Sequence, residues 1–231
     1  MIHVLNRLVI LVGFSLVLIA GCGAPPESAG KKIQEPLYPV TCIGVLPAVP
    51  AVDVDKELSP EELENLHQGA KVMNMLLAQK LGEQERIFLV GEEDMSGLEL
   101  SGTEDSLDTL RQVGQSISCN AILETTVRRY TERIGTKWSV EQPAAVAFQF
   151  RLIGVDIGNI LWSAKFDEEQ ISLLENLYNL GKAKTRGFTW ITAADLMLEG
   201  IQEKLSASPY FNKLLPRDIR EKSPEFFEDK V

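Results

Sequence analysis

The chain has 231 residues, 45% of them hydrophobic and 24% charged, which is the composition of a globular protein rather than a disordered or fibrous one. Its formal net charge of −10 argues against nucleic-acid binding, because phosphates are bound by basic surfaces. The two histidines argue against a histidine-ligated metal centre and a Ser–His–Asp hydrolase, since both depend on imidazoles at the site. We therefore expect no metal, no cofactor and no nucleic-acid partner.

Residues 1–21 are expected to be an export signal. Arg7 is the only charged side chain before Glu27, and an apolar run extends from Leu8 to Ala20. As a helix this run would be about 20 Å long, whereas a spanning helix must cross roughly 30 Å of hydrocarbon. A positive start, a short apolar middle and small residues at the end are typical of a cleaved signal peptide.

The signal ends in Ile19-Ala20-Gly21-Cys22, which resembles the bacterial lipobox, in which the cysteine is acylated and becomes the new N-terminus. Several acyl chains form a stable anchor, which one chain does not. Gly23, in place of Asp, implies the outer membrane where the proteobacterial sorting rule applies. Residues 22–39 then read as a lipidated tether with a reach on the order of 20 Å. The alternative is an ordinary secretory signal with an incidental cysteine.

The folded domain is expected over residues 40–206, and its first half alternates strands and helices. The apolar run Thr41–Val49, ended by Pro50, predicts a buried strand. Ser59 to Glu62 predict a capped helix start, followed by apolar residues three and four apart. That apolar face comprises Leu63, Leu66, Ala70, Met73, Leu77 and Leu81. Next come a second buried strand (Ile87–Val90), a helix from Asp105 and a third strand (Ala121 to Arg129). The inner side of that helix comprises Leu107, Leu110, Val113 and Ile117.

The second half predicts an antiparallel hairpin. Val146, Phe148, Phe150 and Leu152 alternate with small or polar residues, Gly158-Asn159 marks the turn, and Ile160, Trp162, Ala164 and Phe166 alternate on the return. A short helix is expected over Ile171–Leu180, and Thr192 to Asp195 resemble a capping box for a last helix whose Leu196, Ile201 and Leu205 face the sheet. Residues 207–231 read as an irregular tail.

This order of elements, βαβαβ followed by ββ and α, predicts an α/β fold. Right-handed crossovers would make the first three strands parallel, and the hairpin would extend the sheet in the antiparallel sense. We expect a single three-layer domain with a mixed sheet.

The element order behind an acylated cysteine resembles a superfamily of outer-membrane lipoproteins. It includes the curli secretion channel protein, the Pel exopolysaccharide lipoprotein and activators of penicillin-binding proteins, and the N-terminal domain of TolB has a related fold. The matching segments are Ile43–Pro47, Ile87–Val90 and the passage from Val113-Gly114 through Cys119 to Leu123, with Asn120 where Asp is common. Members mostly act as assembly factors, pores or activators and offer no catalytic residue to transfer. The resemblance therefore implies a protein-interaction role.

Three polar segments are candidate chemical sites. Asp167, Glu168 and Glu169 could supply paired carboxylates for acid–base catalysis, but a solvated strand end explains them better. Asp53–Glu64 has oxygen-bearing residues at the spacing of a calcium loop, yet Leu58 replaces the required glycine. Lys182, Lys184 and Arg186 form a basic loop that lacks the first glycine of a phosphate loop, and it could contact a partner or anionic lipid. His67 is expected to be structural.

Cysteine and aromatic residues provide the remaining candidates. Cys42 and Cys119 begin the first and third strands, so they form either a disulfide in an oxidising compartment or two buried thiols. Trp162 fits the core, and Phe226 and Phe227 either dock on a partner or belong to a frayed tail. The leading hypothesis is a non-enzymatic, periplasm-facing lipoprotein that acts through protein contacts or self-assembly. The alternatives are a module that binds a ligand or cell-wall fragment, and an enzyme that uses acidic residues.

Overall fold

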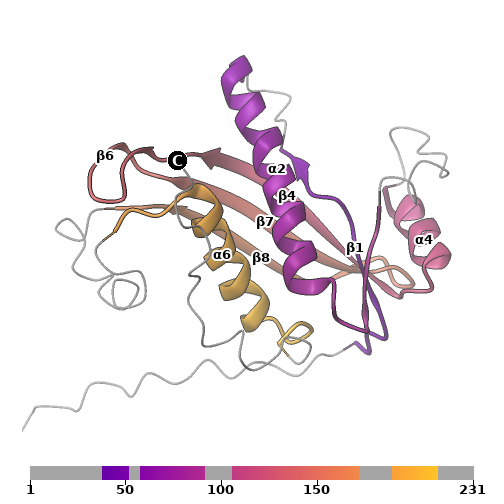
Figure 1. The fold of residues 1–231 in the computed structure, drawn as a ribbon. Helices are drawn as coiled ribbons and strands as arrows, with labels where there is room; N and C mark the ends of the chain where they lie inside the picture. Colours follow the sequence, from indigo (N-terminus) through magenta and orange to yellow (C-terminus); the bar gives the residue numbers. More distant parts are fainter. Residues whose placement is uncertain (1–37, 52–57, 92–105, 172–188, 213–231) are drawn as a thin grey trace, which may run out of the picture. The chain divides into compact units, whose positions relative to one another are not determined.

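A computed structural model describes residues 38–51, 58–91, 106–171 and 189–212 (Figure 1). The chain divides into two units, Met1–Gln34 and Glu35–Val231, and all described residues belong to the second. The elements follow in the order β1 (Ile43–Val45), β2 (Val49–Pro50), α2 (Pro60–Leu81), β3 (Ile87–Leu89), α4 (Ser106–Ser116), β4 (Ala121–Thr131), β5 (Ile134–Gly135), β6 (Val140–Gln142), β7 (Ala145–Gly154), β8 (Asn159–Glu169) and α6 (Ala193–Ala207).

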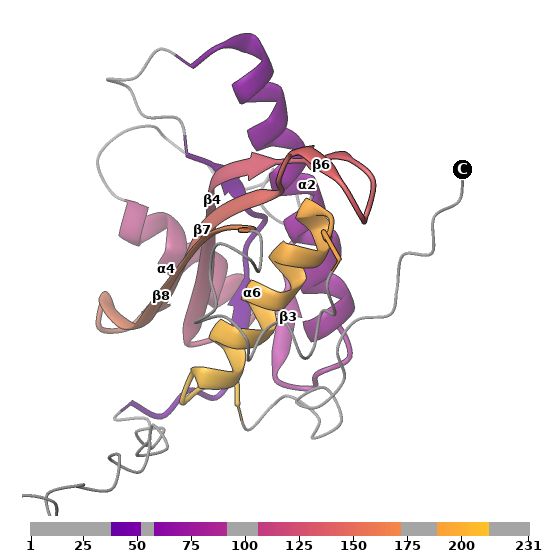
Figure 2. The same cartoon turned by 90° about the vertical axis from the view of Figure 1, so that its left-hand side faces the viewer.

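The main sheet has the strand order β3-β1-β4-β7-β8, and β2 also pairs with β4. β1 is parallel to β3 and to β4, whereas β4–β7 and β7–β8 are antiparallel. Helices α2 and α6 pack on one face of this sheet and α4 packs on the other (Figure 2). The predicted α/β class, mixed sheet, antiparallel hairpin and C-terminal helix are confirmed.

Capping boxes set the beginning of α2 and of α6. The backbone N–H of Glu62 donates to the hydroxyl of Ser59, and the Glu62 carboxylate accepts from the Ser59 N–H at 2.8 Å. Thr192 and Asp195 make the same reciprocal pair at the start of α6. The apolar face predicted for α2 is buried except at Leu63, which lies in the exposed first turn, where the predicted burial is wrong.

The main core lies between the sheet and the helices α2 and α6, and aromatic rings fill its centre. Phe148 has its ring centroid 5.0 Å from that of Phe150 and 5.2 Å from that of Phe166. Trp162 stacks on Phe150 and contacts Phe211, which is wholly buried although it follows the predicted domain end at residue 206. A smaller apolar cluster lies beneath α4 and comprises Val90, Leu110, Val113, Ile122, Ile153 and Val155.

Two predicted strands differ from the structure. The run Thr41–Val49 forms β1 and β2 with a break between them, and Pro50 is the last residue of β2. The break contains Pro47, which has no N–H to donate to a ladder, while β2 tolerates Pro50 because it pairs with β4 alone. β3 was expected to be buried, but it is an edge strand whose Phe88 and Leu89 are exposed.

The register of the β7–β8 hairpin departs from strict alternation near the turn. Leu152 pairs with Trp162, but the next pair is Ile153 with Ile160, so Leu161 forms a bulge. The extra residue places Ile160 on the opposite face of the strand from Trp162. Ile160 is 56% exposed, and the prediction that it continues the buried face is therefore wrong.

Because α2 packs closely on β4, adding one methyl group at Gly69 is expected to destabilise the protein. An added Cβ atom would lie 2.6 Å from the Cβ atom of Tyr130, which the backbone of β4 holds in place. We expect Gly69→Ala to lower the free energy of unfolding by about 1–3 kcal/mol despite the better helix propensity of alanine. Chemical denaturation measures this change. The exposed neighbour Gln68→Ala is the control, and an equal effect in both variants would contradict the packing argument.

Candidate functional site

The long strands give the sheet two ends that carry different groups of side chains. The register places Ile43, Ile87, Ala121 and Gly154 at one end, and Thr131, Ala145 and Glu169 at the other. We call the first end the amino pole, comprising residues 38–42, Arg86, residues 118–120 and residues 154–160. The second end is the hairpin pole, comprising residues 132–142 and 189–192. Figure 1 shows β6 at the end of the sheet remote from α4.

A tight turn shapes the tip of the β5–β6 hairpin. The N–H of Thr136 donates to the carbonyl of Ser139 at 2.8 Å, and the hydroxyl of Thr136 accepts from the N–H groups of Trp138 and Ser139. Gly135 has a φ of 120°, and a Cβ atom there would lie 2.5 Å from the Ser139 carbonyl oxygen. Glycine is therefore required at this position.

The hairpin is attached to the start of α6 by charged and backbone groups. The Glu132 carboxylate accepts from the N–H groups of Arg133 and Ala193, both at 3.0 Å, which satisfies a free donor at the helix N-terminus. The Arg133 guanidinium donates to the Trp190 carbonyl at 2.5 Å, and the Trp190 N–H donates to the Lys137 carbonyl at 2.9 Å. These bonds fix the direction of the hairpin relative to the core.

Apolar side chains nevertheless point outward from this fixed hairpin. Trp138 is 70% exposed and Ile134 is 52% exposed. The ammonium group of Lys137 lies 5.8 Å from the centroid of the Trp138 ring, within the range of a cation–π contact. An exposed tryptophan on a pre-organised turn is suited to anchor an interface, because the turn loses little conformational entropy when a partner binds.

A buried tyrosine lies beneath the hairpin pole. Burial first, and then the negative charge of Glu132, raise the pKa of the Tyr130 hydroxyl. The hydroxyl therefore stays protonated throughout the physiological pH range. Tyr130 packs against Gly69 of α2, which makes it a structural support of the hairpin pole.

The amino pole holds the beginning of the described chain against the sheet. The Asn120 side chain accepts from the N–H of Thr41 at 2.9 Å and donates to the Pro39 carbonyl at 2.9 Å. The Arg86 guanidinium donates to the carbonyls of Val40 and Thr41. The Tyr38 hydroxyl donates to Asp156 at 3.1 Å. Residues 38–41 are thus held by Arg86 just before β3, by Asn120 just before β4 and by Asp156 in the β7–β8 turn.

A disulfide joins the same segment to the beginning of β4. The structure bonds Cys42 to Cys119 across a sequence separation of 77, with their Cα atoms 4.6 Å apart. This separation lies within the usual range for a disulfide, and β1 and β4 are adjacent parallel strands. The bond adds a covalent link to the hydrogen bonds that hold residues 38–41.

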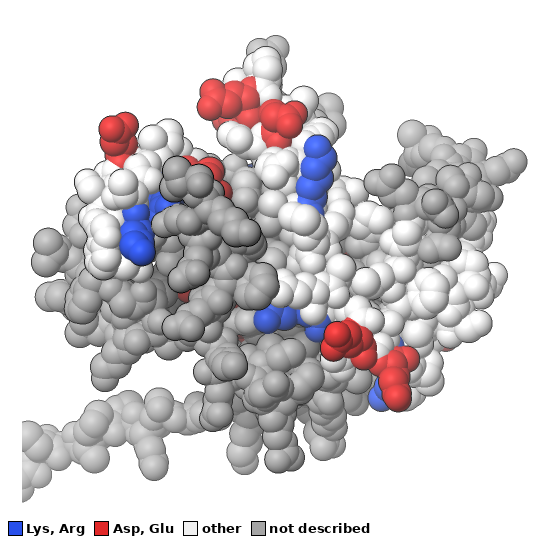
Figure 3. Space-filling view, viewed as in Figure 1, with Lys and Arg blue, Asp and Glu red and all other residues white. Residues whose placement is uncertain are grey.

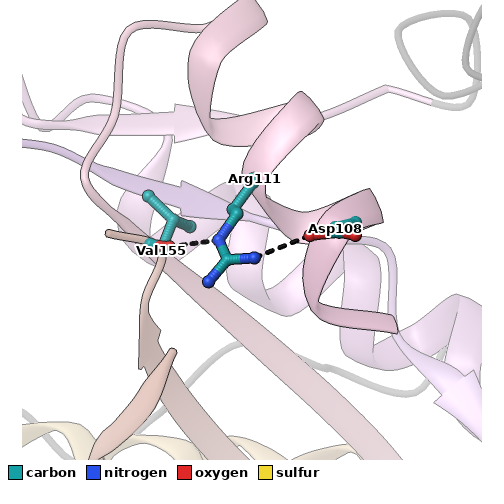
Figure 4. A network of polar contacts seen from close by, with 3 residues as sticks. All are labelled: Asp108, Arg111 and Val155. Atoms are coloured by element: carbon teal, nitrogen blue, oxygen red, sulfur yellow. Dashed lines mark hydrogen bonds and ion pairs between the residues drawn. The ribbon is translucent and has the colours of Figure 1, made fainter. Parts of the chain in front are cut away.

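The turn between β7 and β8 is the third part of the amino pole. The guanidinium of Arg111 donates to the Val155 carbonyl at 3.3 Å and pairs with Asp108 at 2.6 Å, as Figure 4 shows. The Val155 N–H donates to the Asn120 carbonyl at 3.1 Å. Gly158 has a φ of 67°, and Leu107 of α4 fills the space beside it. The turn is therefore fixed from both β4 and α4.

The acidic candidates for catalysis form exposed ion pairs. Arg129 of β4 lies 2.5 Å from a carboxylate oxygen of Asp167 and 3.8 Å from one of Glu169. Asp167 and Glu169 point to one side of β8, and Glu168 points to the other. An arginine that neutralises two solvent-exposed carboxylates is typical of a strand surface and does not create a proton donor for catalysis.

Replacing these two carboxylates separates the ion-pair interpretation from the enzymatic one. We expect the double variant Asp167→Asn with Glu169→Gln to change the free energy of unfolding by less than about 1 kcal/mol, because exposed ion pairs contribute little. Cellular function should persist in the variant strain. Loss of function with an unchanged melting transition would instead support the enzyme hypothesis.

A small apolar hollow of about 180 Å³ opens at the carboxyl ends of β1 and β3, where open α/β sheets commonly bind ligands. Its volume is below the usual range for a small-molecule site. Asn74, a polar side chain in its lining, already accepts a hydrogen bond from the N–H of Ala48 at 2.7 Å. Ligand binding in this hollow is therefore less well supported than a protein contact at the hairpin pole.

Several predicted site residues lie outside the described part of the chain: Cys22, the basic loop with Lys182, Lys184 and Arg186, the tail residues Phe226 and Phe227, and the acidic residues Asp53, Asp55 and Glu57. The same holds for the predicted signal and, after Ile171, for the predicted helix Ile171–Leu180. His67 is exposed on α2. Trp162 packs in the core as predicted, and Trp190 is half-buried at the hairpin pole.

Charged side chains form no further candidate site on the described part of the face that Figure 3 shows. In the view of Figure 3, acidic side chains gather over the start of α2 and basic side chains are scattered. The described residues contain no group of three or more His, Cys, Asp or Glu side chains placed to hold a metal ion. None of the helices in the described ranges has the length and apolar character needed to cross a bilayer.

Local sequence patterns predict neither the amino pole nor the hairpin pole, because each is formed by residues that are distant in the sequence. β5 and β6 have two and three residues, too few for an alternating pattern, so the exposure of Trp138 was not predicted. Gly135 beside the short run Thr136–Ser139 is the local signal that could have indicated the turn. Asn120 and Arg86 act on residues distant in the sequence, and no local pattern reveals such contacts.

Comparison with known proteins found similar solved structures but no matching family model and no matching curated protein. The PelC dodecamer from Paraburkholderia phytofirmans is 12% identical, with 72% of this chain and 86% of that chain covered and a TM-score of 0.41. The LpoB C-terminal domain from Salmonella enterica is 14% identical, with 60% and 90% covered and a TM-score of 0.35. Lipoprotein GNA1162 from Neisseria meningitidis is 15% identical, with 64% and 97% covered and a TM-score of 0.32. PelC and LpoB are thus among the proteins whose solved structures are similar to this one.

Proposed function

We propose that this chain is a lipid-anchored protein of the bacterial outer membrane that faces the periplasm and works by protein–protein contact, without catalysis. Its role would be in envelope assembly, export or polysaccharide secretion. The lipobox ending in Cys22 supports the anchor, and the resemblance to lipoproteins of assembly and secretion supports the contact function. The partner is either another envelope protein or further copies of the same chain.

The hairpin pole is the surface that carries this proposal. Trp138 is exposed on a turn whose hydrogen bonds hold it in one direction, and Ile134 extends the apolar surface. Aromatic residues in pre-organised positions contribute most of the energy of many interfaces. The hairpin pole lies at the opposite end of the sheet from residues 38–42, where the chain from Cys22 arrives. A partner can therefore reach it while the protein is anchored.

Neither alternative has comparable support in the described residues. The acidic candidates Asp167 and Glu169 are neutralised by Arg129 on an exposed strand. The hollow beside β1 and β3 is small and apolar, and its Asn74 is engaged with Ala48. Protein contact is the function that the geometry supports best.

Photo-crosslinking in living cells tests the proposed contact. A photoreactive amino acid replaces Trp138 in the full chain, and the adducts are identified by mass spectrometry after illumination. We expect a discrete adduct with one partner or with a second copy of the chain. The same amino acid at Phe88, which is exposed on the edge strand β3, is the matched control and should give no such adduct.

A binding measurement with the captured partner follows from the same proposal. Trp138→Ala should weaken the complex by about 2 kcal/mol or more, roughly thirtyfold in dissociation constant, if Trp138 is an anchor residue. Phe88→Ala should leave the affinity unchanged. Equal adducts at both positions, or equal affinities for both variants, would overturn the hairpin pole as the contact surface.

A further inference from the structure

We infer that the amino pole rests on the membrane, with Ile157 and Ile160 of the β7–β8 turn inserted among the lipid headgroups. The amino pole would contact the same bilayer that the proposed acyl anchor enters, so the inference rests on the proposed function. It assigns a second membrane contact, made by the folded domain itself.

Both isoleucines are exposed although the turn that carries them is rigid. Ile157 is 47% exposed and Ile160 is 56% exposed. Val155, just before them, is held by Arg111 and Asn120, and Gly158 is closed against Leu107. The turn cannot fold back to cover these side chains without losing those contacts.

The two isoleucines flank the turn on both faces of the hairpin. Ile160 is paired with Ile153, whose side chain belongs to the cluster beneath α4. Gly154 follows Ile153 in the strand, so a Cβ atom on Gly154 would point to the opposite face, which α2 and α6 cover. That Cβ atom would lie 3.2 Å from the side chain of Ile157, so Ile157 lies on the α2 and α6 side of the turn. Exposed isoleucines therefore lie on both faces of the hairpin end, beside the exposed polar residues Asp156 and Asn159.

The beginning of the described chain lies against this tip, and the proposed anchor is sixteen residues earlier in the sequence. The Tyr38 hydroxyl binds Asp156, the residue directly before Ile157. Residues 23–37, the proposed tether, connect Tyr38 to Cys22, and a flexible tether of that length would reach on the order of 20 Å. Because Asn120, Arg86 and the Cys42–Cys119 bond fix residues 38–42, the tether leaves the domain from the pole that carries Ile157 and Ile160.

The charges around the tip suit a zwitterionic membrane surface. Arg111 is paired with Asp108, and Asp156 accepts from Tyr38. The loop before β3 adds the exposed acidic residues Glu83 and Glu85 beside Arg86. A pole of mixed sign gains little from anionic lipids, whereas exposed isoleucines gain from leaving water on any bilayer. The contact should accordingly be insensitive to salt.

Fluorescence quenching by labelled lipid tests the inference. The full acylated chain carrying Ile157→Cys is labelled with an environment-sensitive dye and reconstituted into phosphatidylcholine vesicles that contain a lipid with a nitroxide on its headgroup. Ile160→Cys is the second variant, and Lys137→Cys at the hairpin pole is the matched control. We expect strong quenching and a blue shift at positions 157 and 160, with neither at position 137.

The outcomes separate this inference from the anchor on which it rests. Mass spectrometry of the N-terminal peptide and flotation with vesicles report the anchor: a chain that is not acylated at Cys22 and does not float overturns both. A chain that floats but shows no quenching at positions 157 and 160 keeps its anchor and overturns the inference. Equal quenching at positions 137, 157 and 160 means that the domain lies on its side, which also overturns it.

Discussion

We expect the Phe148→Ala variant to lose about 3–5 kcal/mol of unfolding free energy, a large share of the total for a single domain. Phe148 is 1% exposed, and its ring lies between those of Phe150 and Phe166 at the centre of the main core. Removing the ring leaves a cavity that the paired strands β4, β7 and β8 cannot close, because their register is fixed on both sides. Urea denaturation measures the change.

Phe88→Ala is the matched control for this variant. It removes the same side chain from the edge strand β3, where the ring is 44% exposed and has less packing to lose. We expect the control to lose clearly less stability than Phe148→Ala. Equal losses in the two variants would mean that the aromatic cluster is not the centre of the core.

The second large effect concerns the bond between Cys42 and Cys119. Replacing both residues with alanine should lower the free energy of unfolding by about 2–4 kcal/mol, because a cross-link over a separation of 77 residues restricts the unfolded chain. A reductant should destabilise the wild-type protein by a similar amount and leave the double variant unchanged. Thiol counting under denaturing conditions should find neither cysteine free in the oxidised protein.

Two further results would contradict this prediction, one of them by showing that the bond is absent and the other by showing that it adds no stability. If both thiols react before reduction, Cys42 and Cys119 are buried thiols, and residues 38–41 are held by hydrogen bonds without a covalent link. If the double variant is as stable as the wild type while the bond is present, the hydrogen bonds already fix residues 38–42 and the bond adds nothing measurable.

Local patterns predicted the parts of this fold that local chemistry determines. The capping boxes at Ser59 and Thr192 each involve residues three apart, so the sequence alone indicates where α2 and α6 begin. The alternation along residues 146–152 likewise predicts β7 and its buried face. These signals need no knowledge of the rest of the chain.

The departures arise where one residue changes the geometry or a distant segment intervenes. The bulge at Leu161 reverses the face of Ile160, and an alternating pattern cannot show that extra residue. Phe211 is buried because its ring packs against that of Trp162, which is distant in the sequence. No helical or strand periodicity of apolar residues around Phe211 indicates this burial. The exposure of Trp138 depends on bonds from the Trp190 segment. Both poles are products of tertiary contacts.

The mass of the detergent-extracted, acylated protein, with and without the Trp138 side chain, is the most direct test of the proposed protein contact at the hairpin pole. Native mass spectrometry should show the wild-type chain in a discrete complex, either with copies of itself or with one envelope protein, and acyl groups on Cys22. The Trp138→Ala variant should keep its acyl groups and its fold and dissociate from that complex. A wild-type protein that is monomeric and unpartnered in the membrane extract, or a complex unaffected by the loss of Trp138, would contradict the proposed contact.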